Sequence, residues 1–200
     1  MRTLYTIGYA TKPIELFIEQ LRRYGITAVA DVRSVPYSKA FRDYHQESLK
    51  ARLEQAGIRY VYLGDELGPR SKDPAHYDEC GQVQFDRLMQ TPLFKQGVDR
   101  VSAGLDKGFH IALMCAEKDP ATCHRSLLVA YYLQRIGGWS IEHIRHDGGL
   151  ENQTALEARL REMHGAGDDL FASAEEQAQR AYKLQVKKIA YVRPEGPSGD

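Results

Sequence analysis

The sequence lacks the features that mark membrane and secreted proteins. No apolar run approaches the roughly 20 residues that cross a bilayer, and the opening residues, MRTLYTIGYATKP, contain no apolar stretch of the secretory type. Cysteine is scarce: there are three, an odd number, without the paired spacing of a disulfide framework. These absences predict a cytoplasmic protein with free thiols and no membrane partner.

The chain also lacks an excess of either charge. Its 27 basic and 27 acidic residues cancel, which excludes a globally basic nucleic-acid binder but leaves a local basic patch open. A hydrophobic content of 42% with 12 tyrosines is typical of a globular chain. A chain of 200 residues buries roughly 70% of its unfolded surface, so its core needs neither disulfides nor a structural metal.

Short apolar runs alternate with helical patterns along most of the chain. This alternation predicts an α/β fold: three layers, a mostly parallel sheet of about five strands, and helices on both faces. We expect one domain over residues 1–165 and a C-terminal helical extension over 166–200 that packs on it, with frayed last residues. The expected strands are 4–7, 26–30, 58–63, 109–114 and 141–144; the expected helices are 13–24, 48–56, two within 84–107 broken near Thr91, 126–136, 150–163 and part of 170–193.

Polar and reactive residues follow the end of every predicted strand. In an open α/β sheet, ligands bind outside the carboxyl ends of the strands, so these residues should converge on one edge. The alternative is that strand ends are simply where polar residues begin. The residues concerned are Gly8, Tyr9, Asp31, Arg33, Asp65, Glu66, Cys115, Glu117, His146 and Asp147.

The segment CAEKDPATCHR, residues 115–125, is the sharpest of these motifs. Cys115 and Cys123 are candidate nucleophiles, because a thiolate near a helix start and an arginine has a lowered pKa. His124 is a candidate general acid or base, and Arg125 a candidate anion ligand. Alternatively, Cys115 is a small buried hydrophobe and Arg125 a structural ion-pair partner. Whether Asp119 or Thr122 caps the following helix stays open.

A metal is not predicted. The seven residues between Cys115 and Cys123 do not match a zinc finger or ribbon, and there is no second cysteine pair. Cys80, in a polar loop, is interpreted as incidental. No cofactor is predicted either, because the chain contains neither GxGxxG after the first strand nor GxxxxGK[ST].

The second motif is Asp31-Val32-Arg33. Asp31 could orient a ligand hydroxyl while Arg33 takes a phosphate, or the two could form an internal ion pair that fixes the loop. Glu66 and Glu117 are further carboxylates at the same edge and candidates for acid–base work.

Aromatic and basic residues alternate in the loop over 37–45. Tyr37 and Arg42 are candidates for stacking on a base and pairing with a phosphate, together with Tyr9 and Gly8 at the end of the first strand. Alternatively, the loop aromatics pack on a neighbouring helix. The basic residues over 180–193 could extend such a surface or simply solvate a helix face.

Several of these motifs together resemble one bacterial family, the domain of unknown function 488. They are TIGY at 6–9, DVRSVP at 31–36, ELG at 66–68 and LMCAE at 113–117 followed by Pro120 and CHR at 123–125. The resemblance covers about residues 3–150 and implies a compact α/β fold with a site at these motifs, but no settled activity. Asp31-Val32-Arg33 also resembles a strand motif of rhodanese-like domains. The tight Cys-x5-Arg loop of rhodaneses and phosphatases is missing, since nine residues separate Cys115 from Arg125.

Together these patterns favour an enzyme, a hydrolase or group transferase. Its substrate would carry phosphate, as a nucleotide or a fragment of single-stranded nucleic acid does. Two other hypotheses remain: a non-catalytic nucleic-acid-binding module with salt-steep affinity, and a thiol- or metal-dependent sensor.

Overall fold

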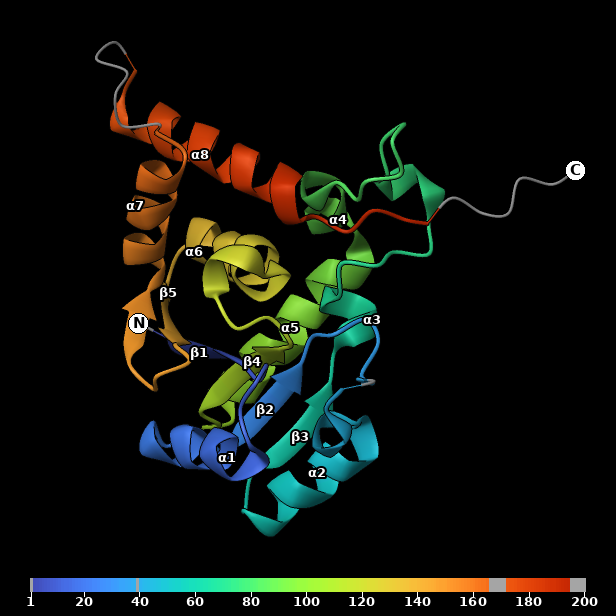
Figure 1. Cartoon of the computed structure of the whole chain (residues 1–200), viewed down its shortest axis with the longest axis vertical. Coiled ribbons are helices and arrows are strands. Elements are labelled where there is room, and N and C mark those ends of the chain that lie inside the picture. The colour runs from blue at the N-terminus through green and yellow to red at the C-terminus, as the bar shows by residue number, and fades with distance from the viewer. Residues whose placement is uncertain (1, 39, 166–171, 195–200) are drawn as a thin grey trace, which may run out of the picture.

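A six-stranded sheet forms the centre of the molecule (Figure 1). Our computed structural model describes residues 2–38, 40–165 and 172–194. The strands are β1 (Arg2–Gly8), β2 (Ala28–Asp31), β3 (Arg59–Tyr62), β4 (Ile111–Cys115), β5 (Trp139–Ile144) and β6 (Leu150–Asn152). Their order is β3-β2-β4-β1-β5-β6; β1 to β5 are parallel, and β6 runs antiparallel to β5.

Helices cover both faces of this sheet. The α-helices are α1 (Ile14–Arg23), α2 (Gln46–Gln55), α3 (Gly64–Leu67), α4 (Phe85–Gln90), α5 (Pro92–Asp106), α6 (Tyr131–Ile136), α7 (Gln153–Met163) and α8 (Ala174–Ile189). Shorter turns are the 3-10 helices η1 (Arg42–Tyr44), η2 (Pro74–His76) and η3 (Pro120–Thr122) and the π-helical η4 (Arg125–Ala130). The three-layer α/β architecture predicted from the sequence is therefore confirmed.

Two apolar cores lie on opposite faces of the sheet, because successive side chains of a strand point to opposite faces. Ala112 and Met114 of β4 join the core beneath α1 and α2, whereas Ile111, Leu113 and Cys115 join the core beneath α5 to α8. Burial on both faces explains why the central strand reads as a continuous apolar run. It also fixes Cys115 on the α5–α8 side of the sheet.

The strand count is six where about five were expected. The missed strand, β6, has only three residues, and Leu150 was assigned to the following helix, which instead starts at Gln153. The chain reverses at Gly148, whose φ of +84° is accessible to glycine at little cost, and then pairs back on β5.

Within this layer, helix α8 lies across α6 and α7 on the side away from the sheet (Figure 1). The Tyr182 ring stacks on Tyr131 at 3.6 Å between centroids, and the Gln185 amide donates to the Ala121 carbonyl at 2.6 Å. The expected boundary near residue 165 adjoins residues that the structure does not describe, so the division into domain and extension stays a prediction. The last residues, which we expect to fray, lie outside the described ranges. None of the helices in the described ranges has the length and hydropathy needed to span a bilayer.

Candidate functional site

The two sequence motifs that follow β2 and β4 meet at the carboxyl edge of the sheet. Nε2 of His124 lies 2.8 Å from the Val32 carbonyl oxygen, in the middle of Asp31-Val32-Arg33. This contact joins residues 92 positions apart in the chain. Because β2 and β4 are parallel neighbours, their carboxyl ends lie side by side, as the sequence analysis expected.

Four reactive side chains gather at this point, and we call them the thiol cluster: Cys115, Glu117, Cys123 and His124. Oε2 of Glu117 lies 2.9 Å from Sγ of Cys115 and 3.0 Å from Sγ of Cys123. Nδ1 of His124 lies 3.6 Å and 4.0 Å from the same two sulfurs. All four donor atoms lie within 4.8 Å of one another.

The loop after β4 brings the second half of the cluster back to the first. Asp119 caps η3 by accepting the Ala121 amide at 2.9 Å, and Pro120 occupies the first helical position. Cys123 then takes an extended conformation, so the next helix begins only at Arg125. The capping question is thus settled: Asp119 is a cap, but of η3 rather than of the helix after His124.

Glu117 differs from the other cluster members in its exposure. Cys115, Cys123 and His124 are buried, at 3%, 1% and 6% exposed, whereas the Glu117 residue is exposed. One carboxylate oxygen of Glu117 nevertheless lies between the sulfurs. Glu117 therefore connects the buried thiols with solvent.

The cluster members change one another's acidity. Burial raises the pKa of the Cys115 thiol well above its usual range, and burial with the neighbouring Cys123 raises that of Glu117. Burial also opposes ionisation of Cys123, but a hydrogen bond from Cys115 and the charge of Arg125 outweigh it, and the pKa falls well below its usual range. For His124, burial is outweighed by the contact with Cys123, which raises the pKa.

Arg125 lies beside the cluster and is fully buried. Its Nη1 donates to the Glu117 carbonyl oxygen at 2.7 Å, and its Nε donates to Oγ1 of Thr6 at 3.3 Å. Nη2 has no hydrogen-bond partner, and Arg125 forms no ion pair with any residue that the structure describes. A buried charge without a counter-charge is costly, so this arginine stands out electrostatically.

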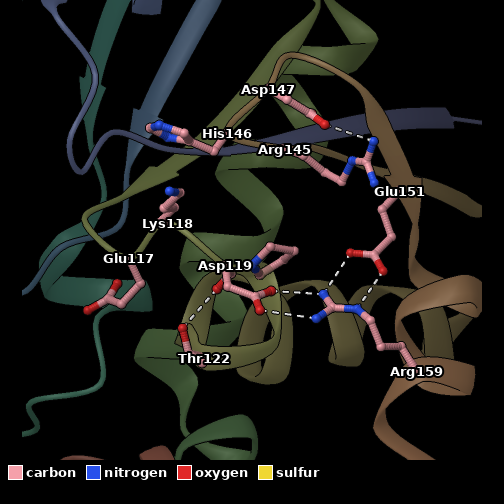
Figure 2. A pocket seen from close by; sticks show the side chains of 10 residues that line it. Glu117, Lys118, Asp119, Thr122, Arg145, His146, Asp147, Glu151 and Arg159 are labelled. Atoms are coloured by element: carbon pink, nitrogen blue, oxygen red, sulfur yellow. Dashed lines mark hydrogen bonds and ion pairs between the residues drawn. The ribbon is translucent and has the colours of Figure 1, made fainter. Parts of the chain in front are cut away.

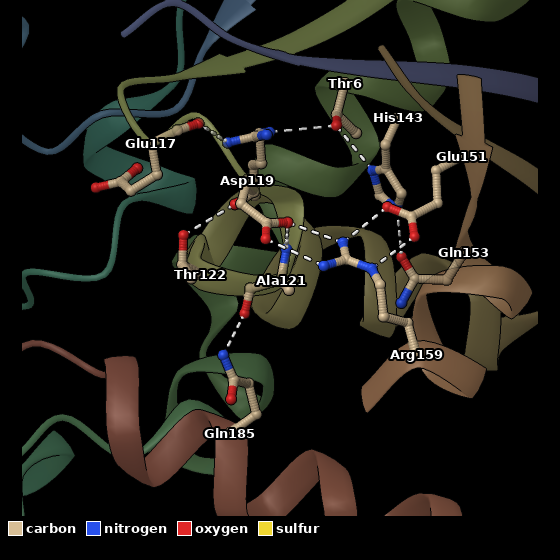
Figure 3. Close-up of polar contacts among 11 residues, drawn as sticks. Thr6, Glu117, Asp119, Ala121, Thr122, His143, Glu151, Gln153, Arg159 and Gln185 are labelled. Carbon is tan, nitrogen blue, oxygen red and sulfur yellow. Dashed lines mark hydrogen bonds and ion pairs between the residues drawn. The ribbon is translucent and has the colours of Figure 1, made fainter. Parts of the chain in front are cut away.

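A chain of hydrogen bonds runs from Arg125 through Thr6 and His143 to Gln153; Figure 3 labels the last three residues. Thr6 lies 2.8 Å from Nδ1 of His143, whose Nε2 lies 2.8 Å from Oε1 of Gln153. Because Gln153 presents its carbonyl oxygen, Nε2 of His143 carries the proton and Nδ1 accepts from the Thr6 hydroxyl. Burial and the charge of Arg125 lower the pKa of His143 to about 3, so this imidazole is neutral at pH 7.

Gly8 makes room for the cluster. A Cβ atom at this position would lie 1.9 Å from the Glu117 carbonyl oxygen and 3.1 Å from Nη1 of Arg125. The amide of Tyr9 donates to the Cys115 carbonyl at 3.1 Å, so the end of β1 lies directly against the loop. Gly8 thus belongs to the site, through its lack of a side chain.

A pocket of about 840 Å³ opens beside the cluster, between the loops after β4 and β5 (Figure 2). Arg159 of α7 closes one side by pairing with Asp119 at 2.8 Å and Glu151 at 2.8 Å. The residues that line the pocket are Glu117, Lys118, Asp119, Pro120, Thr122, Arg145, His146, Asp147, Glu151 and Arg159. Of these, Lys118, Arg145, Glu151 and Arg159 were not among the sequence candidates, because isolated charged residues in loops and on a helix carry no signal of a common site.

A buried lysine that the sequence analysis also missed lies near this pocket. Lys12 is 2% exposed, and its Nζ donates to the Arg145 carbonyl at 3.3 Å. Burial and the charge of Arg125 lower its pKa to about 8. Its position directly before Pro13 read only as a helix start.

Asp31 and Arg33 form a buried ion pair. Nη2 and Nε of Arg33 lie 2.6 Å and 2.9 Å from the two carboxylate oxygens, and Tyr60 donates a further bond at 2.8 Å. The remaining guanidinium nitrogen, Nη1, donates to the Tyr44 carbonyl at 2.9 Å. Every guanidinium nitrogen of Arg33 thus has a partner within the chain, which favours the internal ion pair over a phosphate ligand.

The remaining candidates lie away from the thiol cluster. Glu66 forms an ion pair with Arg100 and lines a separate pocket of about 320 Å³ near α3. Tyr37 is 51% exposed and donates to Glu47 at 2.8 Å, and Arg42 is exposed.

Phe41 and Tyr44 of the aromatic loop pack inward, as the alternative interpretation proposed, whereas Tyr37 is exposed. Tyr9 is buried, with its ring stacked on Tyr44 at 4.1 Å and edge-on to Phe41 at 6.0 Å. Tyr9 and Tyr44 therefore contribute to the core and do not present free faces to a base.

Comparison with solved structures gives remote resemblances only. Two structures of a "Putative phosphatase (DUF442)" from Shewanella putrefaciens CN-32 align with 94% of this chain and with 89% and 87% of theirs. Sequence identities are 15% and 16%, and TM-scores are 0.38 and 0.37, too low to support an argument about function. A search of curated proteins finds no match.

The family comparison is decisive where the structural one is not. The family model described as "Domain of unknown function DUF488" matches residues 13–132. This range holds the Asp31-Val32-Arg33 motif and all four members of the thiol cluster. The match spans more than half of the 200 residues and agrees with the resemblance seen in the sequence, so the chain belongs to the DUF488 family.

Proposed function

We propose that the chain is an enzyme, a hydrolase or group transferase, that acts on a phosphate-bearing substrate in the pocket beside the thiol cluster. The observation that carries the proposal is that Glu117, a member of the cluster, and the neighbouring Lys118 both line this pocket (Figure 2). A reactive residue of the cluster and a lysine without an ion-pair partner among the described residues thus line the same pocket.

The charges of the pocket support an anionic substrate. Asp119 and Glu151 are already paired with Arg159, and Asp147 with Arg145 at 3.1 Å. Lys118 has no ion-pair partner among the described side chains. Its ammonium group is therefore available to a phosphate.

The position of the thiols favours attack by water or an acceptor hydroxyl over attack by sulfur. Cys115 and Cys123 are buried and do not line the pocket, whereas Glu117 does, so Glu117 is the cluster member nearest to a substrate there. In hydrolysis, the oxygen of water would bond to phosphorus while the ester P–O bond breaks. Glu117 would take a proton from the water and then give this proton to the leaving oxygen.

The size of the pocket suits a nucleotide or a short single-stranded fragment. A volume of about 840 Å³ falls within the usual range of about 300–1,000 Å³ for small-molecule sites. The substrate class proposed is therefore a nucleotide or a short single-stranded fragment, bound through its phosphate near Lys118.

Turnover of a panel of nucleotides and generic phosphate mono- and diesters tests this proposal. Glu117→Gln should lower kcat by roughly 10²–10⁴-fold, as expected for removal of a general base. Glu162→Gln, an exposed position on α7, is the matched control and should leave kcat unchanged.

Phosphate binding provides the second arm. Lys118→Gln should raise the KM for the substrate, whereas Lys95→Gln, at an exposed lysine on α5, should not. If no compound is turned over, and Lys118→Gln binds inorganic phosphate and nucleotides as the Lys95→Gln control does, the proposed function is wrong.

A further inference from the structure

We infer that the thiol cluster is a binding site for a divalent transition metal, with Zn²⁺ as the best match. Cys115, Cys123, Glu117 and His124 would supply two sulfurs, one oxygen and one nitrogen. This inference depends on the geometry of the cluster and not on the proposed substrate.

The spacing of the four donor atoms fits a tetrahedral ion. With bonds of about 2.3 Å to sulfur and about 2.0–2.2 Å to nitrogen and oxygen, neighbouring ligands of a tetrahedral site lie about 3.6 Å apart. The sulfur-to-nitrogen distances are already 3.6 Å and 4.0 Å. The sulfur-to-oxygen distances of 2.9 Å and 3.0 Å need an outward movement of the Glu117 carboxylate by less than about 1 Å to match those of a tetrahedral site.

The imidazole of His124 is held in the orientation of a metal ligand. Its Nε2 lies 2.8 Å from the Val32 carbonyl, which can only accept, so Nε2 carries the proton. In the neutral imidazole that binds a metal, Nδ1 then directs its lone pair to the sulfurs. Metal-binding histidines usually donate their second nitrogen to a carbonyl or carboxylate in this way.

The unpaired charge of Arg125 finds its explanation in a bound metal. Two thiolates and a carboxylate around a dication leave one net negative charge. Arg125 is fully buried, lies beside the cluster, and has no ion-pair partner among the residues described. The metal cluster would provide the counter-charge that this arginine otherwise lacks.

The choice of metal follows from the donors. Two thiolates with an imidazole and a carboxylate suit Zn²⁺ better than Mg²⁺ or Ca²⁺, which prefer oxygen ligands. Because Glu117 is an exposed residue that also lines the pocket, the ion would not be fully enclosed, unlike the ion of a structural site. In the sequence, the seven residues between Cys115 and Cys123 argued against zinc because they match no zinc finger or ribbon. That spacing does not reveal Glu117 as the fourth ligand.

Cobalt substitution tests the inference without any substrate. We would titrate the reduced, chelator-treated full chain with Co²⁺ and follow the cobalt–thiolate charge-transfer band and the visible bands of tetrahedral cobalt. The wild-type protein should bind one Co²⁺ with two thiolates, and Zn²⁺ should displace it. Catalysis is not measured, so this result reports on metal binding alone. A metal held by Glu117 would exclude this carboxylate as the free general base of the proposed function, whereas failure of the proposed function leaves the metal site untouched.

Single substitutions then assign the ligands. Cys115→Ser and Cys123→Ser should each halve the charge-transfer band and weaken Co²⁺ affinity by more than about 100-fold. Cys80→Ser, at the exposed cysteine, is the matched control and should bind as the wild type does.

Glu117→Ala keeps the test meaningful if the buried cysteine variants fail to fold, because this side chain is exposed. It should retain the band of two thiolates but weaken affinity by at least about 10-fold. Absence of a thiolate band in the wild type, or a Glu117→Ala protein that binds Co²⁺ as tightly as the wild type, would overturn the four-ligand site.

Discussion

Two buried arginines at the same edge of the sheet have opposite electrostatic surroundings. Arg33, after β2, has a bidentate carboxylate partner in Asp31 and bonds at every guanidinium nitrogen. Arg125, after β4, donates only to a carbonyl and a hydroxyl and keeps one nitrogen without a partner in the described part of the chain. Arg33 therefore has its hydrogen bonds and its counter-charge within the chain, and it fixes a loop. Arg125 needs an anionic neighbour to balance its charge. Satisfaction of hydrogen bonds, and not burial or residue type, separates a structural arginine from one that belongs to a site.

The largest effect should come from breaking the Asp31–Arg33 ion pair. Asp31→Asn leaves the charge of Arg33 buried without compensation and should lower the free energy of unfolding by about 3–5 kcal/mol, measured by urea denaturation. Asp106→Asn removes the partner of exposed Arg2 and should cost less than about 1 kcal/mol. Equal losses in the two variants would mean that the Asp31–Arg33 pair has no special structural weight.

Replacing Arg125, which has no counter-charge among the described residues, should affect metal binding more than folding. Arg125→Met removes the counter-charge of the thiol cluster and should weaken Co²⁺ affinity by about 10–100-fold. The metal-free protein should lose only about 1–2 kcal/mol of stability, because two hydrogen bonds are lost but an unpaired buried charge is removed as well. Urea denaturation of the metal-free form checks the second number. A loss as large as that of Asp31→Asn would place Arg125 in the structural class.

His143, which is linked to Arg125 through the Thr6 hydroxyl, should make stability depend on pH. His143 has a pKa of about 3 in the folded protein and about 6.5 when unfolded, so the unfolded chain binds the extra proton first as the pH falls. Its contribution to stability is therefore present above pH 6.5 and is lost between pH 6.5 and about 3, by about 2 kcal/mol between pH 6.5 and 5. Urea denaturation of wild type and His143→Gln should show a steeper loss for the wild type. Parallel curves would exclude a neutral buried His143.

The smallest effect should come from the tyrosine hydrogen bond to the Asp31–Arg33 ion pair. Tyr60→Phe removes one hydrogen bond to Asp31, should cost about 1 kcal/mol, and should leave Co²⁺ binding unchanged. Tyr37→Phe removes a similar tyrosine–carboxylate bond, to Glu47, from an exposed position and should have no measurable effect on thermal unfolding. A change in Co²⁺ affinity in the Tyr60 variant would show that the two arginine environments are coupled.

The sequence predicted where the site lies better than which residues form it. Apolar runs that end in Asp31 and Cys115 were sufficient to place both at one edge, because parallel strands share their carboxyl ends. The same reasoning also selected Glu66. In the structure, Glu66 follows β3, which β2 separates from β4, and it pairs with Arg100 instead. Strand order cannot be read from alternation, and it decides which loops are neighbours.

By itself, the sequence determined the α/β architecture, the carboxyl edge as the place of the site, and the motifs that gather there, since these depend on local periodicity and on the direction of strands. Only the tertiary structure decided that Glu117 contacts both sulfurs. It also decided that each guanidinium nitrogen of Arg33 has a hydrogen-bond partner, whereas Nη2 of Arg125 has none in the described part of the chain. Those outcomes depend on distances between side chains from different loops. Packing sets such distances, and no pattern along the chain encodes them one by one.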